Sequence, residues 1–244
     1  MRKKNGRAKS PWLRGLLGAL ALTVLAGCAS QPPTVATSAQ RLPPAPKLPV
    51  QGATAYHVVR ADSQLRVLVY RAGPLAAFGH NHVITTTDIQ GTVYVQPRLD
   101  LSGFDLRIPL KSFVIDIPAQ RVQEGPGFGG QPSRADRAGT RKHMLGPVLD
   151  VARYPVMTLR SLGMVGPPWY PRVSVRVTLH GVSHDFVVPT AVFHAGAGRL
   201  VVTGGLALKQ SDFGIKPFTI FNGALSVRNR MDVSFHLVLA PKAR

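Results

Sequence analysis

The stretch RVSVRVTLHG, from Arg172 to Gly181, alternates polar and apolar side chains up to its last two residues. A period of two places successive side chains on opposite faces of a strand, so this pattern predicts a strand with one buried face. The strand-like run VSHDFVVP follows the glycine directly, which predicts a turn and an antiparallel return. The aliphatic face carries Val173, Val175, Val177 and Leu179.

The same alternation recurs on both sides of this stretch. QLRVLVY (64–70) and DVSFHLVLA (232–240) each gather apolar side chains on one face, and further strand-like runs lie between residues 91 and 205. A helix is expected only at about Ser133 to Val151. The roughly 185 residues of this region suffice for one hydrophobic core. Since unpaired edges promote aggregation, such strands must close into a barrel or pack as a two-sheet sandwich, and the periodicity is compatible with both.

The first 28 residues have the character of an export signal. A basic start precedes the uncharged stretch GLLGALALTVLAG (15–27), which is shorter than the roughly 20 residues of a membrane-spanning helix. The stretch leads into LAGC (25–28), which resembles the bacterial lipobox, where the cysteine is acylated after cleavage. Cys28 is the only cysteine of the chain. We therefore expect residues 1–27 to be a signal peptide and Cys28 to be the site of lipid attachment.

Residues 28–53 are expected to form the lipidated cysteine and a tether, in front of one domain at 54–244. Six prolines between Gln31 and Val50 prevent this segment from building a packed element. A lipid-anchored chain of this type is expected in the bacterial cell envelope, facing the periplasm. Ala29 and Ser30 favour the outer membrane, because no Asp follows the cysteine.

Several blocks of the sequence resemble the YceI-like family. They are VLDVARYPVMTLRS (148–161), VRVTLHGVSHDFVVP (175–189) and GGLALKQSDFGI (204–215), followed by SVRNRMDVSFHLVL (226–239). The blocks occur in family order. The resemblance implies an exported, all-β protein with a lipocalin-like antiparallel β-barrel of about eight strands, to which this sequence adds one short helix and a long loop. It also implies a polyisoprenoid chain held inside the barrel.

The resemblance predicts a non-enzymatic protein that binds, carries or sequesters an isoprenoid or similar amphipathic lipid, with the tail inside the barrel. A barrel of about eight strands can hold one small ligand, and each buried methylene contributes about 0.8 kcal/mol. The aliphatic face of 172–179 is a candidate lining, although it also suits an ordinary core. Phe213, Phe218 and Phe221 are candidates for the pocket mouth or for a cover over the barrel end.

The stretch FGHNHVI (78–84) places two histidines two residues apart, so His80 and His82 point to the same side of a strand. A zinc site needs three or four ligands, and no partner stands at a spacing that completes one. We therefore interpret the pair as the polar edge of the ligand pocket, with a metal-binding envelope protein as the alternative. The other candidate metal ligands are His143, His180, His184, Asp185, His194 and His236. The candidate partners for an anionic head group are Arg141, Lys142, His143 and Lys209.

The formal net charge of +19 favours anionic partners. In an exported chain these are lipids or envelope polymers rather than nucleic acid, so an envelope module that binds polyanions is a second alternative. The chain has no GxSxG elbow, and Glu124 is its only glutamate, so the sequence supplies no catalytic residues and implies no cofactor. A homodimer is compatible with these features. The Gly- and Pro-rich segment Ile117–Thr140 departs from the family pattern and is expected to be a long loop, suited to act as a lid.

Overall fold

A computed structural model describes residues 47–48 and 51–242 of the chain. The predicted signal peptide and Cys28 lie outside the described residues, as does most of the predicted tether. Within the described residues, no helix combines the length and the hydrophobicity needed to cross a lipid bilayer.

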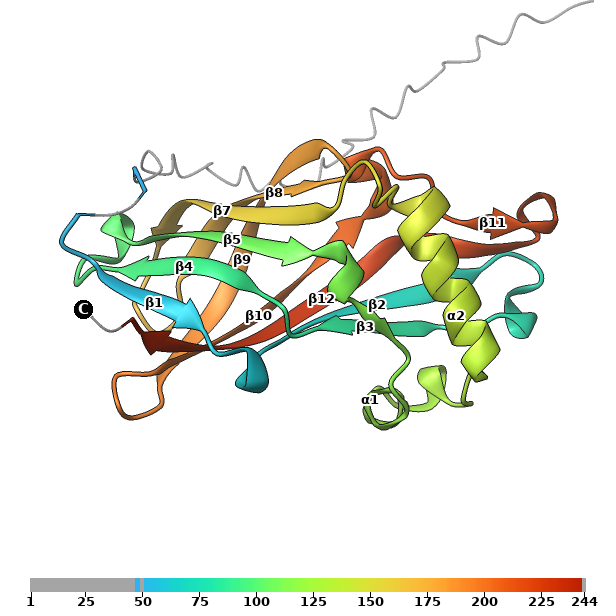
Figure 1. Ribbon diagram of the computed structural model, residues 1–244, viewed down its shortest axis with the longest axis horizontal. Helices are drawn as coiled ribbons and strands as arrows, with labels where there is room; N and C mark the ends of the chain where they lie inside the picture. Colours follow the sequence, from blue (N-terminus) through green and yellow to red (C-terminus); the bar gives the residue numbers. More distant parts are fainter. Residues whose placement is uncertain (1–46, 49–50, 243–244) are drawn as a thin grey trace, which may run out of the picture. The chain divides into compact units, whose positions relative to one another are not determined.

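Antiparallel strands form a single sheet that surrounds the core (Figure 1). The strands are β1 (Thr54–Val58), β2 (Gln64–Ala72), β3 (His82–Thr86), β4 (Gln90–Val95), β5 (Gly103–Pro109), β6 (Val114–Ile115), β7 (Val156–Val165), β8 (Arg172–Leu179), β9 (Val182–His194), β10 (Leu200–Lys209), β11 (Thr219–Ile220) and β12 (Leu225–Pro241).

The sheet closes on itself because β1 pairs with both β4 and β12. The closed ring contains eight strands in the order β1-β4-β5-β7-β8-β9-β10-β12, while β2, β3 and β6 extend the wall from the other half of β12. Closure satisfies the strand edges, which selects the barrel over the sandwich. The predicted lipocalin-like barrel of about eight strands is thus confirmed.

The predicted turn at Gly181 connects β8 to β9. Leu179 pairs directly with Val182, so His180 and Gly181 alone form the turn, with φ values of +53° and +77°. Two left-handed residues are the signature of a type I′ hairpin, whose twist matches that of the flanking strands. Glycine is required here for a second reason, since a Cβ on Gly181 would lie 2.6 Å from Cε1 of Tyr154.

The predicted helix at 133–151 is observed as α2 (Arg134–His143) followed by a π-helical turn at Met144–Val148. Ser133 begins α2 through a capping box. Its hydroxyl accepts a hydrogen bond from the Asp136 N–H at 3.1 Å, and Oδ2 of Asp136 accepts one from the Ser133 N–H at 2.9 Å. Pro147 has no N–H to donate and lies within the π-helical turn, where the helix ends.

The segment Ile117–Thr140 is more ordered than the predicted loop. It contains α1 (Pro118–Gln123), a 3₁₀ turn at Pro126–Phe128 and most of α2. Proline at the first position of α1 is pre-organised for a helix, and the buried Arg121 side chain ties α1 to the barrel. The glycines and prolines therefore separate short helices within an ordered cover. Figure 1 shows α1 and α2 at the same end of the barrel.

Candidate ligand cavity

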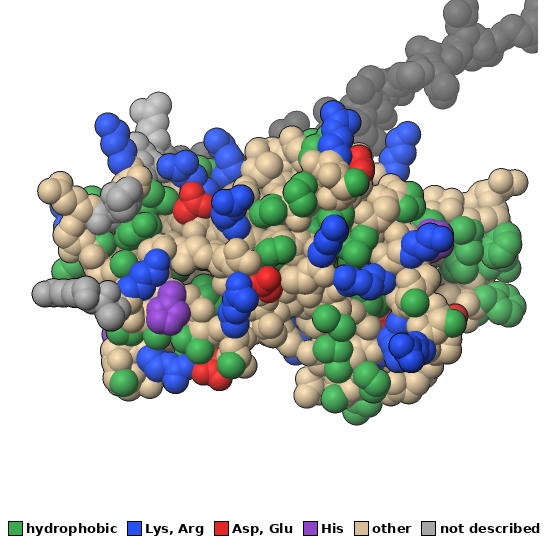
Figure 2. All heavy atoms as spheres, in the orientation of Figure 1, with side chains coloured by type: hydrophobic (Ala, Val, Ile, Leu, Met, Phe, Trp, Pro, Cys, Tyr) green, Lys and Arg blue, Asp and Glu red, His purple; other side chains and the backbone are tan. Residues whose placement is uncertain are grey.

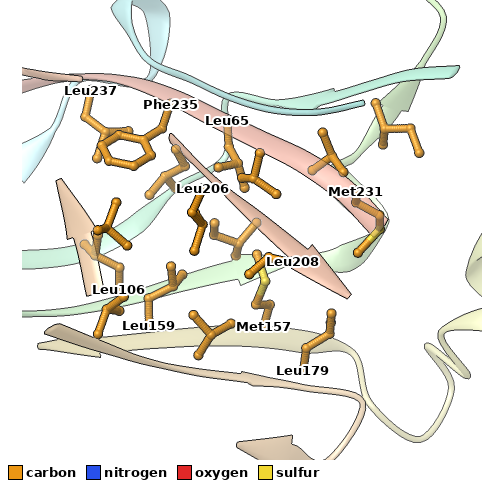
Figure 3. A pocket seen from close by; sticks show the side chains of 18 of the residues that line it. Leu65, Leu106, Met157, Leu159, Leu179, Leu206, Leu208, Met231, Phe235 and Leu237 are labelled. Atoms are coloured by element: carbon orange, nitrogen blue, oxygen red, sulfur yellow. The ribbon is translucent and has the colours of Figure 1, made fainter. Parts of the chain in front are cut away.

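The barrel encloses a cavity of about 540 Å³. Its wall is made mostly of Leu, Val, Ile, Met and Phe side chains, which come from the barrel strands and from α2 and the turn after it, with His, Gln, Ser, Thr and Arg residues at fewer positions. Figure 3 shows such side chains pointing from facing strands toward a common space, among them Leu106, Leu159, Leu206, Phe235 and Leu237. A volume of this size lies within the usual range for small-molecule pockets.

The alternating strands create this wall. On β8 the side chains of Val173, Val175, Val177 and Leu179 are buried and lie on the cavity wall, as the sequence pattern places them. Arg172 and Arg176, on the other face of β8, are exposed. Arg176 meets Asp185 of β9 there in a double contact, with two N–O distances of 2.7 Å. The period of two thus separates an apolar interior from a charged exterior.

The three predicted aromatic residues separate in space. Phe218 lies on the cavity wall, with its ring 4.6 Å from that of His143. Phe213 is completely buried outside that wall, where it packs near Phe186 and His184. Phe221 is 70% exposed on a loop next to β11 and does not line the cavity. Only Phe218 therefore has the position that the sequence interpretation gave to all three.

Among the predicted basic residues, only His143 lies on the cavity wall. Arg141 points to the other side of α2, where its guanidinium donates to the carbonyl oxygens of Phe113 and Lys111 and fastens the helix to the barrel. Lys142 is exposed on α2, and Lys209 is exposed at the end of β10. Arg71, which the sequence did not single out, lies on the wall instead.

His80 and His82 both line the cavity, with ring centroids 6.4 Å apart. His82 opens β3, and its Nδ1 lies 2.7 Å from Oδ2 of Asp116. Asn81 between them holds the loop in place, since its Oδ1 accepts from the Arg71 N–H at 3.0 Å and its Nδ2 donates to the Gly127 carbonyl at 2.7 Å. The two histidines are therefore part of an ordered polar edge.

A buried ion pair stands behind His82. Oδ1 of Asp116 accepts from Nη1 of Arg121 at 2.5 Å and from the Val83 N–H at 2.9 Å, and the same guanidinium nitrogen donates to the Asn81 carbonyl at 2.6 Å. Asp116 is fully buried and Arg121 is 1% exposed. A buried pair of this kind is maintained only where hydrogen bonds replace the lost water.

Burial by itself raises the pKa of the Asp116 carboxyl, but the hydrogen bonds from His82, Val83 and Arg121 outweigh it. The pKa therefore lies below its ordinary value of 3.8, and Asp116 is a carboxylate at neutral pH. It follows that Nδ1 of His82 is the donor in their hydrogen bond. Asp116 also has a φ of +56°, a left-handed backbone that Asp tolerates better than most residues.

Asp116 and Arg121 were not singled out from the sequence. The available signal was IDIPAQR (115–121), in which an acidic and a basic residue five apart flank a helix-starting proline inside an otherwise apolar run. Among the residues that the structure describes, no group of three or more His, Cys, Asp or Glu side chains lies close enough to hold a metal ion.

The family model for the YceI-like domain matches residues 56–239. Comparison with curated proteins finds no significant match. Among solved structures, BcnA of Burkholderia cenocepacia has 18% identity and a TM-score of 0.56, covering 74% of this chain and 98% of that one. A polyisoprenoid-binding domain from Saccharophagus degradans, implicated in plant cell wall breakdown, has 16% identity and a TM-score of 0.53, covering 78% of this chain and 99% of that one. At these identities, the two structures support the fold.

Proposed function

Since the chain belongs to the YceI-like domain family, we propose that it binds a lipid with a long apolar tail, an isoprenoid or a chemically similar molecule, inside the barrel. The cavity carries this proposal: about 540 Å³ enclosed by an almost wholly apolar wall. The related domain from Saccharophagus degradans is described as polyisoprenoid-binding, which supports the same ligand class for this chain.

The energetics favour a tail over a polar ligand. Each methylene that moves from water to the wall contributes about 0.8 kcal/mol, so a few isoprene units suffice for micromolar binding. A sugar or peptide would have to leave most of its hydrogen bonds unmade against Leu206, Leu159 and their neighbours. The chain needs no bond chemistry for this role, and binding and release would serve carriage or sequestration.

The polar end of the ligand is proposed to lie at the histidine edge. With Nδ1 of His82 engaged by Asp116, Nε2 is the ring nitrogen left for a ligand; it accepts from a hydroxyl when neutral and donates to a phosphate when protonated. Arg71, His80 and His143 line the same end of the cavity and add further donors. A prenyl alcohol or prenyl phosphate fits this arrangement better than a pure hydrocarbon.

A cavity-blocking variant tests the proposal. Leu206 of β10 lies on the cavity wall, and its neighbour Ala207 is exposed on the outer face of the same strand. We expect Leu206→Trp to fill the space and abolish uptake of added prenyl lipid, with Ala207→Trp as the matched control that keeps it. Purified wild-type protein, extracted with organic solvent and analysed by mass spectrometry, should release a lipid. Absence of both bound lipid and uptake by folded wild-type protein would refute the proposal.

The proposed place of action is the cell envelope. The basic and apolar start of the chain and the LAGC stretch support export and acylation of Cys28. Labelling of cells with a palmitate analogue should mark the wild-type protein and leave Cys28→Ser unmarked. Labelling of both proteins, or of neither, would contradict an anchor at Cys28.

A further inference from the structure

Four exposed apolar side chains lie together at the end of the barrel that carries the β2–β3 connection and β11. Leu75 and Phe78 lie on the β2–β3 connection and are 37% and 81% exposed; Ile220 ends β11 and is 37% exposed, and Phe221 begins the β11–β12 connection and is 70% exposed. In Figure 2 hydrophobic atoms cluster at the end of the molecule where Figure 1 places β11. We call these four residues the apolar tip.

The two connections form one surface. The Leu75 N–H donates to the Ala224 carbonyl at 2.8 Å. Gly79 lies so close to Leu225 that a Cβ there would stand 2.9 Å from its Cδ1. The guanidinium of Arg71 braces the first loop by donating to the carbonyls of Ala77 and Gly79, at 3.3 and 2.7 Å. The apolar tip is therefore an ordered surface formed by two connections that are held together by a hydrogen bond and close packing.

The folded chain gains little from presenting these residues. Phe221 has a φ of +51°, a backbone conformation that costs roughly 1–2 kcal/mol for a residue with a Cβ other than Asn or Asp. A phenyl ring that is 70% exposed makes few contacts that would offset this cost. Contiguous exposed apolar residues of this kind mark an interaction surface.

The charge around the tip indicates what it meets. Residues 71–82 and 214–231 contain no acidic residue and include Arg71, Lys216 and Arg228, whereas Arg230 is paired with Asp232. Aromatic and aliphatic side chains surrounded by cations fit the surface of a bilayer that contains anionic lipid, where the apolar groups enter the acyl boundary and the cations meet phosphates. A stable protein interface needs about 800 Å² of matched surface on each partner, which four side chains on two projecting loops do not supply.

We propose that the apolar tip docks the barrel end-on into the surface of an anionic lipid bilayer. Ile220 belongs to the tip and also lines the cavity, together with Gly79, His80 and Leu225. Docking therefore turns the histidine end of the cavity toward the bilayer, where a lipid can pass between membrane and barrel without crossing water. This inference goes beyond the proposed ligand, because it concerns the outer surface and does not depend on what the cavity holds.

Site-specific fluorescence tests the docking. In the full chain carrying Cys28→Ser, which removes the only cysteine, single cysteines are introduced as Phe78→Cys, Phe221→Cys and, as control, Trp169→Cys. Trp169 is 69% exposed but lies on the β7–β8 connection at the opposite end of the barrel. With an environment-sensitive label, positions 78 and 221 should shift to the blue and be quenched by brominated lipid on phosphatidylcholine vesicles containing phosphatidylglycerol. The response should weaken without phosphatidylglycerol or in high salt, and position 169 should not respond.

A second comparison uses affinity. Phe78→Ser/Phe221→Ser is expected to lower vesicle affinity by roughly tenfold or more, whereas Trp169→Ser should leave it unchanged. Leu206→Trp should still bind vesicles although it takes up no lipid, which separates failure of docking from failure of the cavity. Docking at this end is overturned if the fluorescence of labels at positions 78 and 221 does not change on vesicles, or if the label at position 169 changes equally. It is also overturned if the blue shift depends on protein concentration in the absence of vesicles, because association of two copies would produce that result.

Discussion

Nδ1 of His82 lies 2.7 Å from Oδ2 of Asp116, so a side chain on the cavity wall is held by a carboxylate that is completely buried. The other oxygen of Asp116 contacts Arg121 at 2.5 Å. The Asp116 carboxylate thereby fixes the orientation of His82, which lines the cavity. The same carboxylate neutralises the guanidinium of Arg121, which has almost no contact with solvent. The orientation of His82 and the stability of the barrel end consequently depend on the same group.

Asp116→Asn is expected to destabilise the protein by about 3 kcal/mol or more at pH 7, because it leaves the buried Arg121 charge without its counter-ion. The measurement is the free energy of unfolding from urea titration, compared with wild type. Equal stability of the two proteins at pH 7 would show that the ion pair contributes nothing.

The effect of Asp116→Asn should depend on pH. The folded-state pKa of Asp116 lies below the ordinary value of 3.8, so its contribution to stability is present above that value and is lost as pH falls through the folded pKa. The gap between wild type and Asp116→Asn should therefore shrink at pH 3. The other carboxylates are common to both proteins, so their effect cancels when the two unfolding free energies are subtracted. A difference in stability that stays constant with pH would show that it does not come from titration of Asp116.

Buried and exposed arginines should differ strongly. Arg121→Ala removes a cation that is 1% exposed and is expected to cost roughly 3–5 kcal/mol. Arg176→Ala breaks a pair with Asp185 at 2.7 Å, but both side chains are about half exposed, so the expected loss is within about 1 kcal/mol. Urea unfolding of both variants makes the comparison, and similar losses would contradict it.

Two glycine substitutions should have opposite signs. Gly181→Ala forces a Cβ against Tyr154 at a φ of +77° and is expected to destabilise by more than about 1 kcal/mol. Gly139 lies inside α2, where a Cβ would meet nothing within 4 Å, so Gly139→Ala should stabilise by up to about 1 kcal/mol. Thermal unfolding gives both shifts, and a stabilising Gly181→Ala would contradict the type I′ turn.

The barrel was predictable because strand patterns are local and the family resemblance chose between two closed arrangements. β8 illustrates this: the face of Val173 and Val175 is assigned by alternation alone, and the hairpin follows from a glycine. The segment 117–140 was less predictable, because short helices such as α1 are held by tertiary contacts of single residues like Arg121. Glycine content alone indicated a loop.

The cavity's polar edge was predictable only in part. His80 and His82 were recognised as a pair, whereas Asp116 reaches His82 from a distance of 34 residues in the chain. Nothing in local spacing links them, since the contact exists only because β3 and β6 are neighbours. Conversely, Lys209 and Lys142 have the right charge, but their positions on a strand and a helix turn them outward.

His82→Phe should keep the tail-binding cavity but lose its preference for lipids with a polar head. Phenylalanine approximates the ring of His82 but removes Nε2, so a prenyl phosphate bound by the protonated imidazole loses a charge-assisted hydrogen bond worth about 1.5–3 kcal/mol, or roughly 10- to 150-fold in affinity. A prenyl hydrocarbon of similar length loses nothing. The measurement is displacement of a fluorescent lipid by each ligand, with the ratio of the two affinities as the result. His236→Phe, at an exposed position of β12, is the matched control and should keep the wild-type ratio. Because a ratio within one variant cancels any general loss of binding-competent protein, an unchanged ratio in His82→Phe would mean that the head group lies elsewhere.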